Sequence, residues 1–221
     1  MPALPRNERA PLTRGRTLGH VAAVYDLLAP VMMLGQEGRY RKLAFRLLDL
    51  RGGERVLDVG CGTGVLTRLV AQRLSEPDAC AVGLDAAPEM IQVARRRAAG
   101  QPHLRFDVGV AEALAYGDAS FDAAISTFFF HHIAADLKRR SLAELRRVLK
   151  PGGKLVIVDV DVPSNWFGRL CAWSGYWLFR QAEIRENIRG ELRRALAEIP
   201  FREVTRVAHH AGHVTVFQAV K

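Results

Sequence analysis

Residues 54–65 read ERVLDVGCGTGV, and this stretch decides the fold of the chain. A short apolar strand, residues 56–59, runs into a turn with glycines at positions 60, 62 and 64, and a helix is expected from Val65. Glycine permits backbone conformations, and close approach of a ligand, that a Cβ would prevent. The first N–H groups of a helix have no partner within the helix. The stretch therefore predicts a ligand lying against bare backbone.

Downstream of this turn, apolar strands alternate with amphipathic helices. The expected strands are 79–84, 104–108, 121–127 and 155–160, and the expected helices are 65–74, 88–99 and 135–149. Strands joined through helices of this length form right-handed βαβ units with parallel strands. Residues 201–207 and 213–220 alternate like an antiparallel pair joined through Gly212. We predict an α/β fold, a Rossmann-like seven-stranded mostly parallel sheet with helices on both faces.

The segments outside this alternation define the domain organisation. Helical periodicity over residues 17–50 predicts an N-terminal helical cover, and residues 164–198 predict a helical insertion, or lid, before the last two strands. Residues 1–16 are basic, contain three prolines and lack the apolar core of a secretory signal, so we expect a flexible tail. Residues 17–221 are predicted to form a single domain.

Composition restricts the class of protein. Hydrophobic residues make up 49% and charged residues 25% of the 221 residues, as in globular proteins. No apolar run approaches the ~20 residues that cross a bilayer, so we expect a cytoplasmic protein, with peripheral membrane contact as a further option. The net charge of +9 favours a polyanionic partner, or reflects arginine on solvated faces. Three scattered cysteines predict neither a disulfide framework nor a metal site.

The glycine spacing argues against a dinucleotide. A dinucleotide fingerprint, G-x-G-x-x-G, requires its last glycine where this chain has Val65, and the third glycine comes one residue early at Gly64. Asp85 ends the second expected strand about 20 residues beyond the turn, where a carboxylate can accept from both ribose hydroxyls of an adenosine. The pattern predicts an adenosine-containing ligand that is neither a nicotinamide nor a flavin dinucleotide.

The chain contains the motifs VLDVGCGTG (56–64), GLD (83–85) with PEM (88–90), AEAL (111–114), SFD (120–122), HH (131–132) and RVLKPGG (147–153). In these motifs the sequence resembles the class I S-adenosylmethionine-dependent methyltransferases, most of all the branch of the ubiquinone/menaquinone C-methyltransferases. The resemblance implies S-adenosyl-L-methionine as methyl donor and S-adenosyl-L-homocysteine as product. It implies an enzyme, and does not identify the acceptor.

The resemblance also implies roles for individual residues. Those expected at the donor are Gly60, Cys61, Gly62 and Gly64 along the methionine part, Asp58 at its amino group, Asp85 at the ribose, Ala86, Met90, Ala111 and Glu112 around the adenine, Ser126 and Thr127 facing the cofactor, and Tyr25 closing over it. One departure concerns the adenine amino group. The family often has an acidic acceptor where this chain has Gly109-Val110, so Glu112, Asp107 or a backbone carbonyl is expected to substitute.

The fourth strand leads into the expected acceptor side. Methyltransferases that act on amino groups of DNA bases carry a D/N-P-P-Y/F turn there, whereas this chain has STFFFHH, residues 126–132, which argues against nucleic acid as substrate. The three phenylalanines predict a hydrophobic mouth, with at least one of them in the core. His131 and His132 are the candidate general bases. The alternatives are that they are structural, or that the reaction needs no base.

The insertion contains all three tryptophans of the chain. Trp166, Leu170, Trp173 and Trp177 recur at steps of four, three and four, so they share one helix face, with arginines nearby. This face is interpreted as a membrane contact, a lid over an apolar substrate, or ordinary core. His209, His210 and His213 are interpreted as a solvated strand and turn.

Together these features predict methyl transfer to a small or lipid-like hydrophobic acceptor. The first alternative is a quinone or phospholipid methyltransferase at an anionic membrane surface. The second is a non-catalytic S-adenosylmethionine-binding regulator associated with nucleic acid. The oligomeric state is not predicted.

Overall fold

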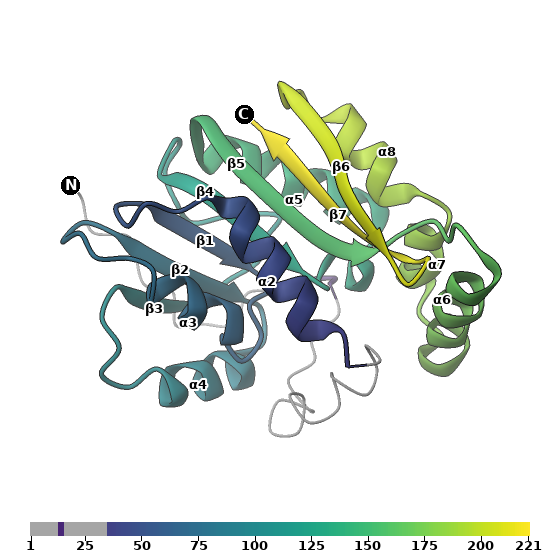
Figure 1. Ribbon diagram of the computed structural model, residues 1–221, viewed down its shortest axis with the longest axis horizontal. Coiled ribbons are helices and arrows are strands. Elements are labelled where there is room, and N and C mark those ends of the chain that lie inside the picture. The colour runs from purple at the N-terminus through teal and green to yellow at the C-terminus, as the bar shows by residue number, and fades with distance from the viewer. Residues whose placement is uncertain (1–12, 16–34) are drawn as a thin grey trace.

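The computed structural model describes residues 13–15 and 35–221 (Figure 1). The expectations for residues 17–34, including Tyr25, lie outside the described residues. The elements in chain order are α2 (Glu37–Leu48), β1 (Arg55–Val59), α3 (Val65–Ala71), β2 (Cys80–Asp85), α4 (Pro88–Arg97), β3 (Leu104–Val108), β4 (Phe121–Thr127), the 3₁₀ helix η2 (Phe130–His132), α5 (Ala135–Val148), β5 (Leu149–Val160), α6 (Trp166–Phe179), α7 (Ala182–Ile188), α8 (Glu191–Glu198), β6 (Glu203–His210) and β7 (Val214–Val220).

The seven strands form one sheet in the order β3-β2-β1-β4-β5-β7-β6. Strands β1 to β5 are parallel, and β7 runs antiparallel to both β5 and β6. The predicted seven-stranded, mostly parallel sheet is confirmed. The strand order reverses between β1 and β4, and ligands of open α/β sheets bind at the carboxyl ends of the strands at such a switch point. The glycine turn after β1 and the segment after β4 lie on either side of it.

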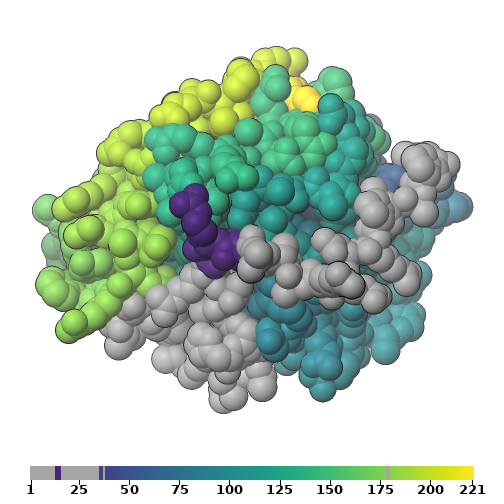
Figure 2. All heavy atoms as spheres, turned by 180° about the vertical axis from the view of Figure 1, so that it is seen from behind, coloured from purple at the N-terminus to yellow at the C-terminus, as the bar shows by residue number. Residues whose placement is uncertain are grey.

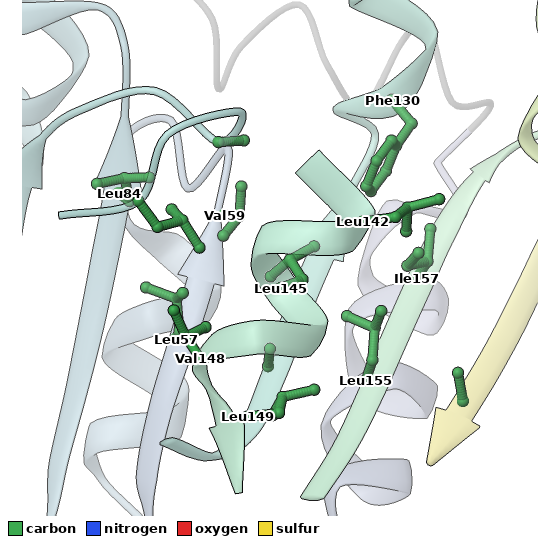
Figure 3. Packing of buried hydrophobic residues seen from close by; sticks show 14 of the residues in the cluster. Leu57, Val59, Leu84, Phe130, Leu142, Leu145, Val148, Leu149, Leu155 and Ile157 are labelled. Carbon is green, nitrogen blue, oxygen red and sulfur yellow. The ribbon is translucent and has the colours of Figure 1, made fainter. Parts of the chain in front are cut away.

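Alternate residues of the strands supply two separate cores. Leu57 and Val59 of β1 pack with α5 and α8, whereas Val56 packs on the other face with α2 and α3. Figure 3 shows the first of these cores, with Leu142 and Leu145 of α5 directed toward the sheet. Because side chains alternate between faces along a strand, Asp58 points to the same side as Val56. The glycine turn is thus held between two packed layers.

Strand β5 begins earlier than predicted. The sequence Lys150-Pro151-Gly152-Gly153 is typical of a break after a helix, yet β5 runs through it from Leu149. The end of the chain explains the difference, because the Gly152 N–H donates to the Lys221 carbonyl and the Lys221 N–H donates to the Gly153 carbonyl. A register shift against β4 accommodates the extra residues.

The helical insertion predicted for residues 164–198 consists of separate helices. Helix α6 ends at Phe179, where Arg180 takes a left-handed conformation with φ of 47°, and α7 and α8 follow. Helix α6 lies at the end of the molecule away from β3 (Figure 1). Strand β6 includes His209 and His210, both half-buried rather than solvated.

Candidate functional site

The three glycines of the turn after β1 all have positive φ, and they serve different purposes. A Cβ on Gly64 would lie 2.5 Å from the Phe106 ring, so glycine there permits α3 to pack against β3. A Cβ on Gly62 would meet no atom within 4 Å in the part of the chain that the structure describes. Gly62 therefore borders open space, as expected of backbone that receives a ligand.

The turn is fastened to the end of β2 by hydrogen bonds. The N–H groups of Gly60 and Cys61 donate to the Leu84 carbonyl at 2.8 and 3.1 Å. Asp85 accepts from the Gly62 N–H at 2.9 Å and from the Ala87 N–H at 2.9 Å. Burial raises the pKa of Asp85, against the effect of these N–H groups. Asp85 thus fixes the turn and presents a carboxylate beside it, as the ribose assignment requires.

Asp58 is a buried carboxylate with one unsatisfied oxygen. It is 2% exposed, and its Oδ2 accepts from the Thr67 hydroxyl at 2.6 Å. Its Oδ1 has no hydrogen-bond partner among the described residues. Burial raises its pKa to about 7. An orphaned carboxylate oxygen is costly unless a donor or cation completes it. The amino group of a methionine-containing cofactor supplies such a cation, so the residues present fit the implied cofactor.

A hollow lies next to the glycine turn, at the carboxyl ends of β1, β2 and β3. Its lining includes the predicted Gly60, Ala86, Ala111 and Glu112, and also Thr13, Gly15, Val59, Leu84, Gly109, Val110, Phe129 and Ile133. The Thr13 hydroxyl donates to Glu112 Oε1 at 2.7 Å. Figure 2 shows residues 13–15, in dark purple, seated on this side of the molecule. The walls of the hollow are mostly apolar.

Other predicted donor residues are not among the residues that line the hollow. Met90 is buried against Ala87, and the Ser126 hydroxyl, fully buried, donates to the Val59 carbonyl at 2.9 Å. Thr127 is half-buried at the end of β4. Asp107, one of the three expected substitutes at the adenine, instead binds Arg105 and the Tyr116 hydroxyl. Ser126 therefore joins the ends of β1 and β4, and Asp107 is engaged within the protein.

The three phenylalanines after β4 differ in burial. Phe130 is fully buried in the α5 core, which confirms the expectation that at least one belongs to the core. Phe129 is half-buried, and a Cβ on Gly60 would lie 2.7 Å from its ring. Phe128 takes a positive φ of 55° and packs edge-on against Tyr40 of α2. The segment between β4 and η2 thus packs against the glycine turn through Phe129.

Each histidine of η2 has a partner that the sequence analysis missed. His131 Nδ1 lies 2.7 Å from Oδ1 of Asp159, at the end of β5, and His132 Nδ1 lies 3.1 Å from Oε1 of Gln181, between α6 and α7. Both partners are buried. The position of Asp159 at the end of a parallel strand was a usable signal, because those ends converge. Gln181 gave no comparable signal.

Helix α6 presents much of its predicted aromatic face to solvent. Trp166, Leu170 and Trp177 are 76%, 61% and 68% exposed, whereas Trp173 packs against the cluster formed by α6 and α7. Ordinary core packing therefore applies to Trp173 and not to the other three. Among the described helices, none has the length and apolar character to span a bilayer. In the described ranges, no grouping of three His, Cys, Asp or Glu side chains suits a metal ion.

Comparison with known protein families and sequences agrees with this geometry. Residues 56–153 match the family described as a methyltransferase domain. The chain is 36% identical over 149 residues to the ubiquinone/menaquinone biosynthesis C-methyltransferase UbiE of Geobacter sp. strain M21, covering 66% of this chain and 62% of that protein. It is 39% identical over 146 residues to the demethylmenaquinone methyltransferase of Deinococcus radiodurans, covering 66% and 59%. The chain thus spans about three-fifths of these relatives.

Solved structures share the fold at lower identity. Geranyl diphosphate C-methyltransferase from Streptomyces coelicolor A3(2) aligns with a TM-score of 0.64 at 16% identity, over 83% of this chain and 76% of that one. The [4+2]-cyclase SpnF aligns with a TM-score of 0.62 at 20% identity, over 96% and 99%. Their names give different reactions, so the shared fold alone does not specify the chemistry.

Proposed function

The chain belongs to the class I S-adenosylmethionine-dependent methyltransferases, and from this premise we propose that it transfers the methyl group of S-adenosyl-L-methionine to a small, lipid-like acceptor. The observation that carries the proposal is the unsatisfied, buried Oδ1 of Asp58 above a glycine turn that borders open space. The bound cofactor would supply a sulfonium methyl group, which is already activated for displacement. The protein's part is to bind, orient and exclude water.

Each part of the donor has a complementary group in the chain. Asp58 would accept from the amino group, and Asp85 from the ribose hydroxyls next to the turn it fastens. The hollow around Ala86 and Ala111 would hold the adenine. The acceptor would enter on the β4 side, where Phe129 lies against Gly60 and η2 follows. This arrangement supports in-line transfer across the switch point of the sheet.

We propose an aromatic ring of the quinone type, in its reduced hydroxylated form, as the acceptor. The names of the matched relatives support this class, and the half-buried Phe129 after β4 provides an apolar wall. A direct test is methyl transfer from methyl-labelled S-adenosylmethionine to 1,4-dihydroxynaphthalene, with a phenol, a thiol, an amine and a short RNA as parallel acceptors. Transfer to the naphthalenediol is expected. Transfer only to RNA, or donor binding without transfer to any acceptor, would favour the nucleic-acid-associated alternatives.

We propose in addition that α6 contacts an anionic membrane from which such an acceptor is drawn. Trp166, Leu170 and Trp177 are exposed on a helix of 14 residues without an acidic side chain, and Arg169 and Arg180 are exposed beside them. Apolar side chains flanked by cations bind the interface of anionic bilayers. The net charge of +9 supports the same partner.

Vesicle sedimentation tests this contact. We expect binding to phosphatidylglycerol-containing vesicles that weakens with salt, and a loss of about tenfold in the Trp166→Ser/Trp177→Ser variant. The control is Val204→Ser/Val207→Ser, which removes two exposed apolar side chains from β6. Equal vesicle binding by the two double variants would show that α6 is not the membrane contact. Binding to neutral vesicles alone would show that the positive charge plays no part.

A further inference from the structure

Residues 13–15 form a short segment, the strap, on the surface of the molecule at the hollow next to the glycine turn (Figure 2). Thr13 and Gly15 line this hollow together with Gly60 after β1 and Ala86 after β2. The adenine of the proposed donor would lie in the same hollow. The strap and the adenine therefore meet at one site.

The strap is attached to two separate elements. The Thr13 hydroxyl donates to Glu112 Oε1 at 2.7 Å and accepts from the Gly15 N–H at 2.9 Å, so one oxygen atom both shapes the strap and holds it. The Arg14 guanidinium pairs with Asp136 in the first turn of α5. These contacts hold the strap between the segment after β3 and the start of α5.

The strap also fits closely against an apolar wall of the hollow. A Cβ on Gly15 would lie 3.0 Å from Cγ2 of Ile133, a buried residue that lines the hollow and packs in the α5 core. Such a distance is tighter than most side-chain contacts, so glycine at this position permits the strap to lie against Ile133. No space for a ligand is left between the two residues.

The strap leaves little room beside the glycine turn. The hollow has a volume of about 20 Å³, which is space for about one water molecule. A purine is several times larger. The ends of β1 and β2, which also line the hollow, are hydrogen-bonded to each other within the sheet, whereas side-chain contacts hold the strap. The strap is therefore the wall that can move when an adenine enters.

The strap engages a group that the adenine is expected to use. Glu112 is an expected acceptor for the adenine amino group, and its Oε1 accepts from Thr13. Asp107, another expected acceptor, binds Arg105 and the Tyr116 hydroxyl. Because a hydroxyl and an amino group are both donors, Thr13 and the adenine compete for Glu112.

We propose that the strap is an autoinhibitory contact: residues 13–15 cover the adenine part of the unliganded site, and the donor binds only after they leave it. The inference rests on the proposed donor site. Such a contact lowers the apparent donor affinity in proportion to the fraction of molecules whose strap is displaced. Because the attachment includes one hydrogen bond to a carboxylate and one exposed ion pair, the reduction should be about tenfold or less.

The first test follows the strap in the wild-type protein. Trypsin cleaves the Arg14–Gly15 bond in proportion to the population in which this segment is free of the surface. Saturating adenosine should raise the rate of this cleavage about fivefold, because it keeps the strap displaced. Cleavage after Arg189, in the turn between α7 and α8, is the internal control and should not change. Slower or unchanged cleavage after Arg14 with adenosine overturns the proposal.

The second test measures affinity for S-adenosyl-L-homocysteine by calorimetry. Thr13→Val keeps the size of the side chain and loses the hydroxyl, so it should bind about fivefold more tightly than the wild type, and Thr13→Ser should bind like the wild type. Arg14→Gln should gain about twofold. The matched control is Arg194→Gln, which breaks an exposed arginine pair with Glu191 on α8 and should change nothing. Weaker or unchanged binding by Thr13→Val overturns the proposal.

Two fragments of the donor locate the effect. Adenosine should bind Thr13→Val more tightly by the same factor. S-Methylmethionine, which has the sulfonium and amino acid groups without the adenosine, should bind the variant and the wild type equally. An equal gain for both fragments would place the effect outside the adenine site and overturn the proposal.

These outcomes separate the strap from the proposed function. If adenosine binds as expected and the wild type methylates no acceptor, the proposed methyl transfer fails, and the cleavage and affinity results still support the strap. If adenosine binds neither the wild type nor Thr13→Val, the proposed donor site fails and the strap proposal fails with it.

Discussion

The donor side and the acceptor side of the site are built in different ways. On the proposed donor side, backbone N–H groups and Asp85 fasten the glycine turn after β1 to the end of β2, so the backbone itself shapes the turn. On the acceptor side, η2, β5 and α7 contribute side chains that are far apart in the chain and meet in a buried network. A site shaped by backbone leaves its pattern in one short stretch of sequence, whereas a site made by side-chain contacts is distributed over the chain.

The largest expected difference between the two sides is in donor binding. Asp85→Ala removes the predicted ribose acceptor and the partner of the Gly62 N–H, so S-adenosylmethionine binding should weaken by about 100-fold or more. Asp159→Asn changes the acceptor side alone and should stay within about threefold of the wild type. Calorimetric titration of both variants measures the contrast.

Asp85→Asn separates the two effects of that substitution. The amide keeps one acceptor oxygen and can still hold part of the turn, so its loss should be smaller, about tenfold. Equal losses in the Asp85 and Asp159 variants would break the distinction between the two sides.

The sequence predicted the fold, and it located the proposed donor side, for a physical reason. Alternating strands and helices determine a parallel sheet, and a glycine turn followed by Asp85 about 20 residues later predicts where an adenosine would lie. These are local patterns, and the sheet order and the hydrogen bonds of Asp85 agree with them. The assignments to Asp58, Asp85 and the adenine hollow stay predictions until a donor complex is measured.

The acceptor side was less predictable because tertiary contacts decide it. In the sequence, Asp159 is only a polar residue at the end of an expected strand. It lies next to His131 because the folded sheet places the two residues side by side. Gln181 becomes a partner of His132 because Arg180 interrupts the insertion in a left-handed conformation, which no glycine signalled. Pairing with Lys221 turns Gly152 and Gly153 from an expected break into strand. For Asp159 and for Gly152-Gly153, the deciding partner is distant in the chain.

Two glycines of the turn provide a second contrast, within the donor side. Gly64→Ala places a Cβ against Phe106 at positive φ, and should lower the free energy of unfolding by about 3 kcal/mol. Gly62→Ala meets open space and should cost about 1 kcal/mol from its backbone conformation alone. Urea denaturation measures both.

Donor binding should rank the same glycine variants in the opposite way. Gly62→Ala, although better folded, should bind S-adenosylmethionine more weakly than Gly64→Ala does under conditions where both are native, because its new methyl group occupies the ligand's space. If Gly62→Ala bound the donor like the wild type, the open space beside Gly62 would not be the donor site.

The smallest expected effect is the release of one proton or less from Asp58 when the donor binds. Burial raises the pKa of Asp58 from 3.8 to about 7, so the unliganded protein holds this carboxyl protonated at pH 6 and should lose stability as pH rises from about 4 to about 7. An ammonium group at Oδ1 favours the carboxylate, so binding should release close to one proton at about pH 6 and roughly a quarter at about pH 7.5. Calorimetry in buffers of different ionisation enthalpy counts these protons.

Asp58→Asn should release none at either pH. Release that is the same in Asp58→Asn and wild type would mean that the donor's amino group lies elsewhere, and the orphaned oxygen would then have to be satisfied by a different part of the ligand.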